Sequence, residues 1–384
     1  MAAINLVKRS FLKTAFAIAL VSAPFATQAN AEDYAAAQTY FHSFTNNISV
    51  TSGVFALNKD LSMDTSAYLK YSVDVINSSG DDEGGTVVSG ASSAATTGVS
   101  DTRNDINLGF THNFKNIIGL EAYYDYSKET DYTSKTPTIT LKKDLFDKNT
   151  TLSLGYSRND DDISGKFLGN TQTRTTDNFF LGVTQVISPV TVAQIGYSRS
   201  NSRGQMSEGI RLVPLNGVAA STCTAESATC VDEAHPSSRY RDAYILGINH
   251  YFLNSPYEFL EESSVKFTLR YYTDSWDVES YMAEAEWNKY LNDRLLLRLD
   301  YRYYTQTAAY FVKDIYTASD EFKSSSPQLV SKDTQLAGVK LTYEFEEDES
   351  SGIRLGSIEG KYEAWAESTD VYAHIIMAAV RFNF

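Results

Sequence analysis

The stretch RLLLRLDYRYYTQTAAYF, residues 294–311, alternates between two kinds of side chain. One parity holds Leu295, Leu297, Leu299, Tyr301 and Tyr303, and the other holds Arg298, Asp300, Arg302, Tyr304 and Gln306. A β-strand places successive side chains on opposite faces, so this segment predicts a strand with an apolar face and a charged face. Such a strand fits a boundary between an apolar environment and water.

The same alternation recurs along the chain, and no 3.6-residue pattern is sustained anywhere. Examples are AYLKYSVDV (67–75), NDINLGFTHNF (104–114), IGLEAYYDYS (118–127) and SSVKFTLRYY (263–272). We predict strands at 36–43, 47–57, 61–76, 103–114, 117–128, 135–145, 150–159, 174–187, 190–201, 239–252, 263–273, 277–290, 294–306, 334–345, 354–366 and 370–384. The chain is therefore expected to be all-β with about 16 strands, and 14 is the alternative count.

Short and long connections between these strands alternate. Short ones are expected at 58–60, 114–116, 146–149, 188–189, 291–294 and 346–352, and longer ones at 78–100, 161–173, 203–237 and 307–333. Outer-membrane barrels have short periplasmic turns, long extracellular loops and an even number of antiparallel strands. The pattern predicts a single transmembrane antiparallel up-and-down β-barrel with both termini at the periplasmic side.

Two soluble architectures are alternatives for a chain of short strands. A β-sandwich would rarely exceed about 250 residues as one domain. A β-solenoid would show a fixed repeat of about 20–50 residues, and none is visible. The 26 tyrosines and 20 phenylalanines, many near predicted strand ends, are typical of the aromatic girdles of a membrane barrel.

The first 31 residues have the pattern of a secretory signal peptide. Three basic residues precede or interrupt an apolar run, and small residues follow at Ala29 and Ala31. Cleavage after Ala31 would leave residues 32–384 as the barrel and change the net charge from −15 to −18. So acidic a chain is not expected to bind nucleic acid, because phosphate binding needs a basic face.

The only two cysteines, Cys223 and Cys230, lie in the polar segment STCTAESATCVDEAHP. In an exported protein, two neighbouring cysteines favour a disulfide over a metal or redox site. No Cys-x-x-Cys-His motif for covalent haem is present, and no cofactor is predicted.

The chain ends in an alternating strand whose last residue is Phe384, with Phe382 on the same face. A terminal strand of this kind resembles the C-terminal signature of bacterial outer-membrane β-barrels. The resemblance implies recognition by the barrel assembly machinery and a location in the outer membrane, in contact with lipid and lipopolysaccharide.

Four blocks resemble an outer-membrane family of unknown function, domain of unknown function 3570. They are RTTDNFFLGVTQVISPVTVAQIGYSRS (174–200), NTTLSLGYSRNDDDI (149–163), LRYYTDSWDVESYMAEAEWNKYL (269–291) and RLDYRYYTQTAAYF (298–311). The run SGASSAATTGVSDTR (89–103) is similar to a Gly/Ala-rich loop of that family. The acidic SSGDDEGG before that loop, and the segment from QMSEGIRLVPLNG to the two cysteines, depart from the family pattern. The resemblance implies the barrel fold and its location, and it implies no reaction.

Charged residues on three neighbouring strands should share one inner wall as a mixed-sign ladder. Counting from the expected turns places Glu286 opposite Arg298, Glu284 opposite Asp300, and Lys266 near both glutamates. The full ladder is Lys266, Arg270, Glu284, Glu286, Arg298, Asp300 and Arg302. Cross-strand pairs contribute roughly 0.2–1 kcal/mol each, whereas Arg or Lys facing lipid at mid-depth costs about 2–4 kcal/mol. The charges are therefore predicted to face inward, either as structural pairs or as a pore lining that selects solutes by charge.

Two acidic runs, Asp81-Asp82-Glu83 and Asp160-Asp161-Asp162, offer carboxylate oxygens of the kind that divalent cations prefer. Neither has the spaced ligands of an EF-hand loop, so solvated loop charge is the simpler interpretation and no metal site is predicted.

The leading functional hypothesis is a passive, porin-like channel for small polar solutes. The alternative is a non-conducting structural or docking barrel for a periplasmic or surface partner, possibly a redox protein. An outer-membrane hydrolase is the third hypothesis, but the five histidines are scattered and no nucleophile-elbow, HExxH or phosphate-loop motif occurs. The loops at 203–237 and 307–333 decide how open the pore is, and their position cannot be derived from the sequence.

Overall fold

A computed structural model describes residues 33–45, 48–78, 99–115, 117–220, 223–224, 227–345 and 352–384, so the predicted signal peptide and the Asp81-Asp82-Glu83 run lie outside the described residues. The strands are β1 (Tyr34–Phe44), β2 (Ile48–Ser62), β3 (Thr65–Ser78), β4 (Val99–Phe114), β5 (Ile118–Lys128), β6 (Tyr132–Leu145), β7 (Thr150–Ile163), β8 (Gln172–Ser188), β9 (Thr191–Gly204), β10 (Leu212–Pro214), β11 (Cys230–Asp232), β12 (Ser238–Phe252), β13 (Ser263–Asp274), β14 (Glu279–Asn292), β15 (Leu295–Gln306), β16 (Lys332–Glu344), β17 (Arg354–Glu367) and β18 (Val371–Asn383). Within these ranges no helix is long and apolar enough to cross a membrane.

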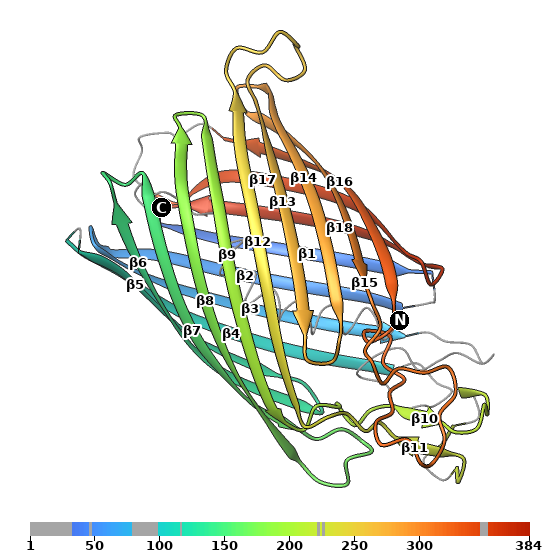
Figure 1. The fold of residues 1–384 in the computed structure, drawn as a ribbon. Coiled ribbons are helices and arrows are strands. Elements are labelled where there is room, and N and C mark those ends of the chain that lie inside the picture. Colours follow the sequence, from blue (N-terminus) through green and yellow to red (C-terminus); the bar gives the residue numbers. More distant parts are fainter. Residues whose placement is uncertain are drawn as a thin grey trace.

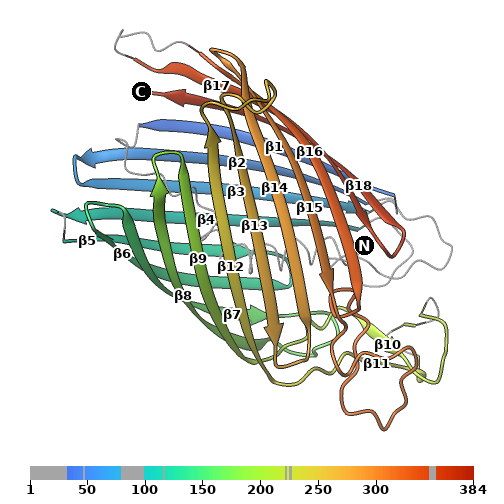
Figure 2. The same ribbon diagram turned by 45° about the horizontal axis from the view of Figure 1, so that its top comes forward.

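Sixteen of these strands close into one antiparallel barrel. Each pairs with its neighbour in the chain, except that β9 pairs with β12 across a long loop and β1 pairs with β18 to close the sheet. Figures 1 and 2 show the closed wall, with the short sheet β10–β11 outside one end of it. The predicted up-and-down barrel of 16 strands is confirmed, and the alternative count of 14 is wrong. The small β10–β11 sheet was not predicted.

The predicted strands agree with the observed ones to within a few residues, except at the turn between β2 and β3. The turn expected at 58–60 is wrong, because Lys59 pairs with Ala67 and Ser62 with Thr65, which puts the turn at residues 63–64. The polar residues extend β2 because they lie at the barrel rim, where Lys59 forms an ion pair with Asp33. Polarity there reflects the rim and does not mark a break in the strand.

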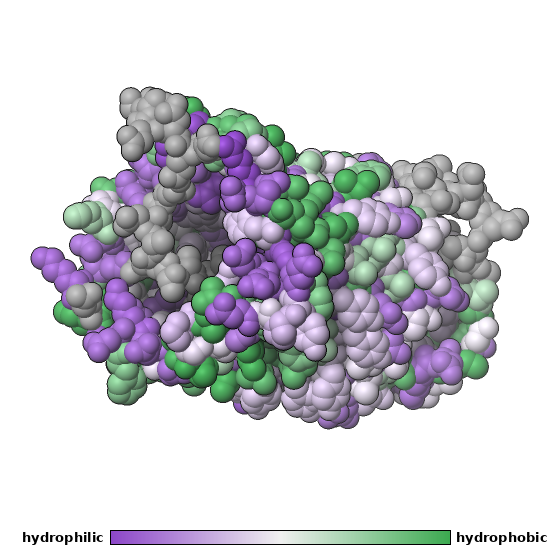
Figure 3. Space-filling view, turned by 90° about the horizontal axis from the view of Figure 1, so that it is seen from above, coloured by the Kyte–Doolittle hydropathy of each residue, from purple (hydrophilic) through white to green (hydrophobic). Residues whose placement is uncertain are grey.

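The two faces of β15 are separated as its sequence predicts. Leu299 and Tyr301 are 43% and 48% exposed on the outer face. Arg298 and Arg302 point to the other side and pair with glutamates of β14. In Figure 3, pale and green residues cover the middle of the visible barrel wall, and hydrophilic residues gather toward its ends. The outer surface therefore has the apolar band that a hydrocarbon environment requires.

A row of tyrosines crosses four adjacent strands on the outer face. Tyr197, Tyr244, Tyr271 and Tyr281 are cross-strand partners in sequence along β9, β12, β13 and β14. Their neighbouring ring centroids lie 5.2, 6.2 and 5.0 Å apart. Tyrosine combines an apolar ring with a polar hydroxyl, so such a row fits the membrane–water interface. The aromatic girdle predicted from composition is present on this side of the barrel.

The two ends of the barrel differ in their loops. Tyr34 and Asn383 are paired, so the N-terminal strand begins beside the end of the last one. The same end carries the tight turns at 63–64, 146–149, 189–190 and 293–294, together with the longer segment 253–262. The opposite end carries 205–237 and 307–331, but also the short connections 129–131 and 275–278. The expected separation of short and long connections is therefore only approximate.

A charged substitution on the outer face of β15 tests whether this face contacts lipid. Leu299→Arg should destabilise the barrel by about 2–4 kcal/mol if Leu299 lies at mid-membrane depth. The measurement is the denaturant midpoint of refolding into lipid vesicles. Thr305→Arg, near the end of the same outer face, is the matched control with a cost of about 0–1 kcal/mol. Equal midpoints for both variants would contradict the assignment of this face to lipid.

Candidate functional site

The barrel encloses a cavity of 760 Å³ toward the long-loop end. Strands β7–β9 and β12–β18 contribute most of its lining, and the long loops close part of its mouth. The residues of the two long loops that face it are Met206, Glu208, Arg211, Glu233, His235, Ser326, Gln328 and Leu329. We call the two loop segments 205–237 and 307–331 the cap.

The two segments of the cap fold against each other. Leu215 bridges Tyr316 and Ala234 bridges Lys323 between them. The Glu233 carboxylate accepts hydrogen bonds from the Ser324 hydroxyl and the Ser325 backbone, both at 2.9 Å. In Figures 1 and 2 the segments lie together at the same end of the barrel as β10 and β11.

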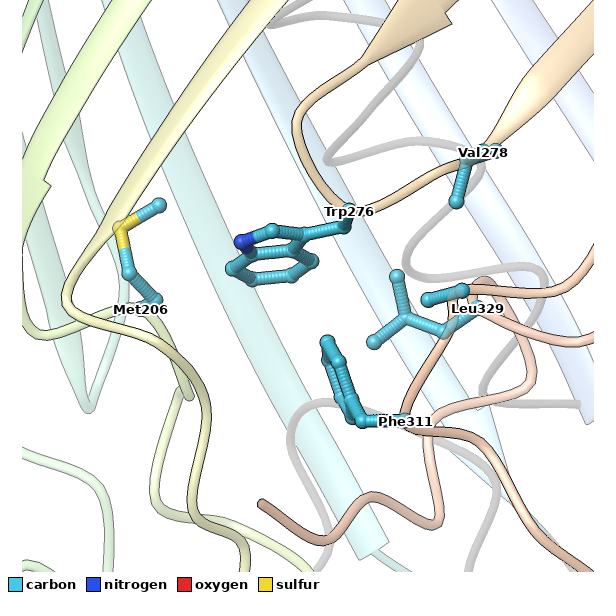
Figure 4. Close-up of a cluster of buried hydrophobic side chains, with 6 residues drawn as sticks. Met206, Trp276, Val278, Phe311 and Leu329 are labelled. Atoms are coloured by element: carbon cyan, nitrogen blue, oxygen red, sulfur yellow. The ribbon is translucent and has the colours of Figure 1, made fainter. Parts of the chain in front are cut away.

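A buried apolar cluster ties the cap to the barrel wall. Its members are Met206, Trp276, Val278, Ala309, Phe311 and Leu329. Figure 4 shows Trp276 entering from the β13–β14 turn between Met206 of one segment and Phe311 of the other. The Trp276 and Phe311 rings meet edge to face at 5.3 Å. The block with the Trp-containing hairpin thus anchors the cap.

Asp274, at the end of β13, organises the same hairpin. Its carboxylate, which is fully buried, pairs with Arg239 and accepts hydrogen bonds from the Tyr272 hydroxyl at 2.6 Å and the Trp276 amide at 2.8 Å. The amide of Val278 donates to it as well, at 3.1 Å. The Arg239 guanidinium also stacks over the Trp276 ring at 4.2 Å. Nothing in the sequence pattern singled out Asp274, because its charged partner Arg239 lies 35 positions away on another strand.

The structure brings six of the seven ladder residues into ion pairs. Lys266 lies 3.0 Å from Glu286, and Arg298 lies 3.5 Å from the same carboxylate. Arg302 pairs with Glu284. Asp300 has a different partner, Lys361 of β17, at 3.6 Å. Arg270 is the exception, since no carboxylate of the described residues lies within ion-pairing distance of it.

The predicted register between β14 and β15 was wrong by two residues. Glu286 lies opposite Asp300 and Glu284 opposite Arg302, whereas Arg298 lies opposite Asn288. The turn occupies Asp293 and Arg294, later than the count assumed, and the bulge between Tyr290 and Asn292 moves the pairing back by one residue. Counting outward from a turn depends on the position of its centre, because an error of one residue there displaces every cross-strand pair by two.

The ladder continues onto two further strands, β16 and β17. Lys340 pairs with Glu359 at 2.6 Å and Lys361 with Glu363 at 2.7 Å. Asp300 reaches Lys361 across β16 because Gly338 lies between them, where a Cβ would come within 2.6 Å of the Asp300 carboxylate. Alternating charges in KYEAWAE (361–367) are a signal that could have revealed this extension.

The three candidate metal ligands on β7 do not converge. Asp161 faces the lumen and pairs with Arg174 at 3.0 Å, while Asp160 faces outward and pairs with Arg158 at 3.1 Å. Asp162 has the same parity as Asp160 and is exposed. Strand alternation separates these neighbours, so they do not form a common set of ligands.

The predicted disulfide is present. Cys223 and Cys230 are bonded, with their Cα atoms 5.6 Å apart, and Cys230 is the first residue of β11. The bond therefore closes the tip of the cap segment that carries the β10–β11 sheet.

The C-terminal phenylalanines lie on the outer face at the short-turn end. Phe382 and Phe384 are 37% and 41% exposed. The Phe384 amide donates to the carbonyl of Asp33 at 3.0 Å, at the seam where β18 meets β1. The terminal strand therefore closes the barrel while its aromatic side chains face outward.

His235 is a titratable group inside the cap. Its ring lies 5.5 Å from that of Trp276 and 5.7 Å from that of Phe311. Burial lowers the pKa of His235 below 6.5, and Arg239 and Arg211 act in the same direction, whereas Glu233 opposes them.

The lowered pKa predicts that the cap loosens in acid. Opening restores the ordinary pKa near 6.5, so the open state binds a proton that the closed state excludes. Cap stability is therefore complete above pH 6.5 and declines as the pH falls below it. Limited proteolysis of the folded barrel at about pH 7.5 and about pH 5 measures this. His235→Phe should reduce the pH dependence, and an undiminished dependence in that variant would contradict the assignment.

A closed barrel with an apolar outer band and a charged interior defines the class: a transmembrane β-barrel of the outer-membrane type. The chain belongs to the family described as protein of unknown function (DUF3570), whose model matches residues 1–168 and 166–372. A comparison with curated proteins finds no match.

Solved structures that resemble the chain are outer-membrane proteins at low sequence identity. The ferric enterobactin receptor of Pseudomonas aeruginosa is 12% identical, with a TM-score of 0.43 over 88% of this chain and 54% of that one. The chain thus spans about half the length of that receptor. OccK8 of Pseudomonas aeruginosa is 8% identical (TM-score 0.43, 91% and 97% covered), and a bacterial polysaccharide outer membrane secretin is 9% identical (TM-score 0.47, 91% and 98% covered).

Proposed function

We propose that the protein is a porin-like passive channel for small polar solutes in the bacterial outer membrane. The observation that carries the proposal is the cavity of 760 Å³, lined by charged and hydroxyl side chains, inside a barrel of 16 strands. Barrels of about this size can leave an aqueous lumen. No catalytic role is assigned to the barrel.

The cap gives the proposed channel a size limit. Its segments contribute side chains to the cavity wall, so a solute entering from the long-loop end must pass beside them. Liposome swelling measures this, with arabinose as a small solute and a trisaccharide such as raffinose as a large one. Swelling in arabinose with little in raffinose is expected. No swelling in arabinose, with the barrel folded, would contradict the channel.

The ordered structure of the cap also favours a rival function, that of a non-conducting barrel that docks a partner protein. The β10–β11 sheet and the disulfide give the cap its own ordered structure. If the barrel docks a partner, a periplasmic or surface protein should co-purify with it stoichiometrically and swelling should be absent.

The proposed location in the outer membrane requires export and insertion. Residues 1–31 act as a cleaved signal peptide, and the strand ending at Phe384 is recognised by the barrel assembly machinery. Lipid and lipopolysaccharide then contact the apolar band and the tyrosine row. Mass determination of the protein purified from outer membranes tests this, and a mature chain beginning near Glu32 is the expected result.

A further inference from the structure

Basic residues outnumber acidic ones around the cavity, although the chain as a whole is acidic. Eight Lys or Arg residues line it against six Asp or Glu residues. Six of the eight are in ion pairs, namely Arg174, Arg211, Arg239, Lys266, Arg302 and Lys332. Among the described residues, Arg241 and Arg270 have no such partner. These two lie on the adjacent strands β12 and β13, on the same side of the lumen.

The carboxylates nearest to these two arginines along the sheet are engaged elsewhere. Asp274 is the direct cross-strand partner of Arg241, but it binds Arg239 and the hairpin backbone. Glu284 lies on β14 one lumen-facing position from the partner of Arg270, but it binds Arg302. The surplus positive charge is therefore fixed by the fold.

Of the two arginines, Arg270 has fewer hydrogen-bond partners for its guanidinium group. Its Nε atom is buried and has no hydrogen-bond partner in the described part of the chain. Its guanidinium lies 5.4 Å from the ring of Tyr272, whose hydroxyl donates to Asp274. Arg241 is better satisfied, since it donates to the Ser202 hydroxyl at 2.8 Å. A buried guanidinium donor without an acceptor is costly, and an entering oxyanion would satisfy it.

The two cross-strand neighbours of Arg270 are apolar. Its direct cross-strand partners are Ile245 on β12 and Met282 on β14, and both line the cavity. An anion bound at the guanidinium would therefore contact hydrocarbon on both sides. Inorganic anions gain nothing from such contacts, whereas an organic carboxylate buries its apolar part against them.

We propose that Arg270 binds the carboxylate of a small organic anion, whose apolar part packs on Ile245 and Met282. Arg241, about 13 Å away along the strand direction, attracts the anion toward this point. Binding itself stands independently of conduction, but the anion preference of the pore that follows from it rests on the proposed function.

Isothermal titration calorimetry on the folded barrel in detergent tests the site, with benzoate as the probe. Arg270→Met removes the guanidinium and leaves no carboxylate unpaired, so benzoate affinity should fall about thirtyfold or more. Lys266→Met is the matched control, because it removes one lumen charge while Arg298 still faces Glu286. Arg270→Lys, which keeps the charge and loses the planar donor pair, should bind with intermediate affinity.

Two further ligands define the chemistry. Benzamide has the same ring without the charge and should not compete, and inorganic phosphate should compete poorly. Equal weakening in Arg270→Met and Lys266→Met, or equal competition by benzamide or phosphate, would overturn the proposal. If Arg270→Met does not fold, the comparison of Arg270→Lys with wild type decides, and an unchanged affinity overturns the site.

Bilayer recordings separate this proposal from the channel itself. Benzoate binding without conductance would support the binding site at Arg270 and contradict the channel. Conductance without benzoate binding would support the channel and contradict the binding site at Arg270.

Discussion

Trp276→Ala is expected to release the cap from the barrel without unfolding the strands. Trp276 is only 3% exposed and contacts the cap and the wall together. Truncating a buried tryptophan removes about 3–5 kcal/mol of packing, and its indole donates a 3.0 Å hydrogen bond to the Ser238 carbonyl that would also be lost. In this cluster Trp276 and Val278 come from the hairpin and the other members from the cap, so the loss should fall on cap closure.

Hydrogen exchange of cap amides measures the effect. The amide of Tyr310, bonded to the Trp276 carbonyl at 2.9 Å, reports on closure, because this bond joins the cap to the hairpin. Its exchange should accelerate at least about a hundredfold, because each 1.4 kcal/mol corresponds to a factor of ten. Strand amides of β3 and β4, across the barrel, serve as the internal control. Trp276→Phe keeps an aromatic ring and should have a much smaller effect, and exchange unchanged in Trp276→Ala would rule out the anchoring role.

Asp274→Asn is expected to have the second large effect. The carboxylate is fully buried and neutralises Arg239, so the amide leaves an uncompensated charge beside the hairpin. Breaking a buried pair in this way costs about 3–5 kcal/mol. The amide also presents an N–H donor where Arg239 or the hairpin backbone requires an acceptor.

The same hairpin provides a control with the same chemical change. Asp277 is exposed and has a φ of 62°, a conformation that asparagine adopts readily. Asp277→Asn should therefore change stability by less than about 0.5 kcal/mol. Urea unfolding of both variants in vesicles makes the comparison, and equal midpoints for the two would contradict the role of Asp274.

Alternation predicted the barrel because it depends only on local sequence. Leu299 and Asp300 face opposite sides whatever the neighbouring strands do, and the position of each strand followed from such pairs. The register between neighbouring strands also depends on the exact position of the turn that joins them. The turn at Asp293 and Arg294 put Glu286 opposite Asp300 and not opposite Arg298, and the local alternation does not fix the centre of a turn.

The candidate site shows the same limit. Lys266 and Glu286 meet as expected because their strands are joined by a short turn. The pairing of Asp300 with Lys361 required knowledge of two further strands and of Gly338 between them. The cap could not be predicted, because its contacts join residues far apart in the chain, such as Glu233 and Ser324, which are 91 positions apart.

The charged lumen is expected to be an open, hydrated path across the membrane. Single-channel recording of the purified, folded protein in planar bilayers tests it most directly. We predict stepwise openings in wild type and a larger conductance in Trp276→Ala, whose cap no longer narrows the mouth. Bilayers that show no openings for either protein, with the barrel shown to be inserted and folded, would contradict an open path through the lumen.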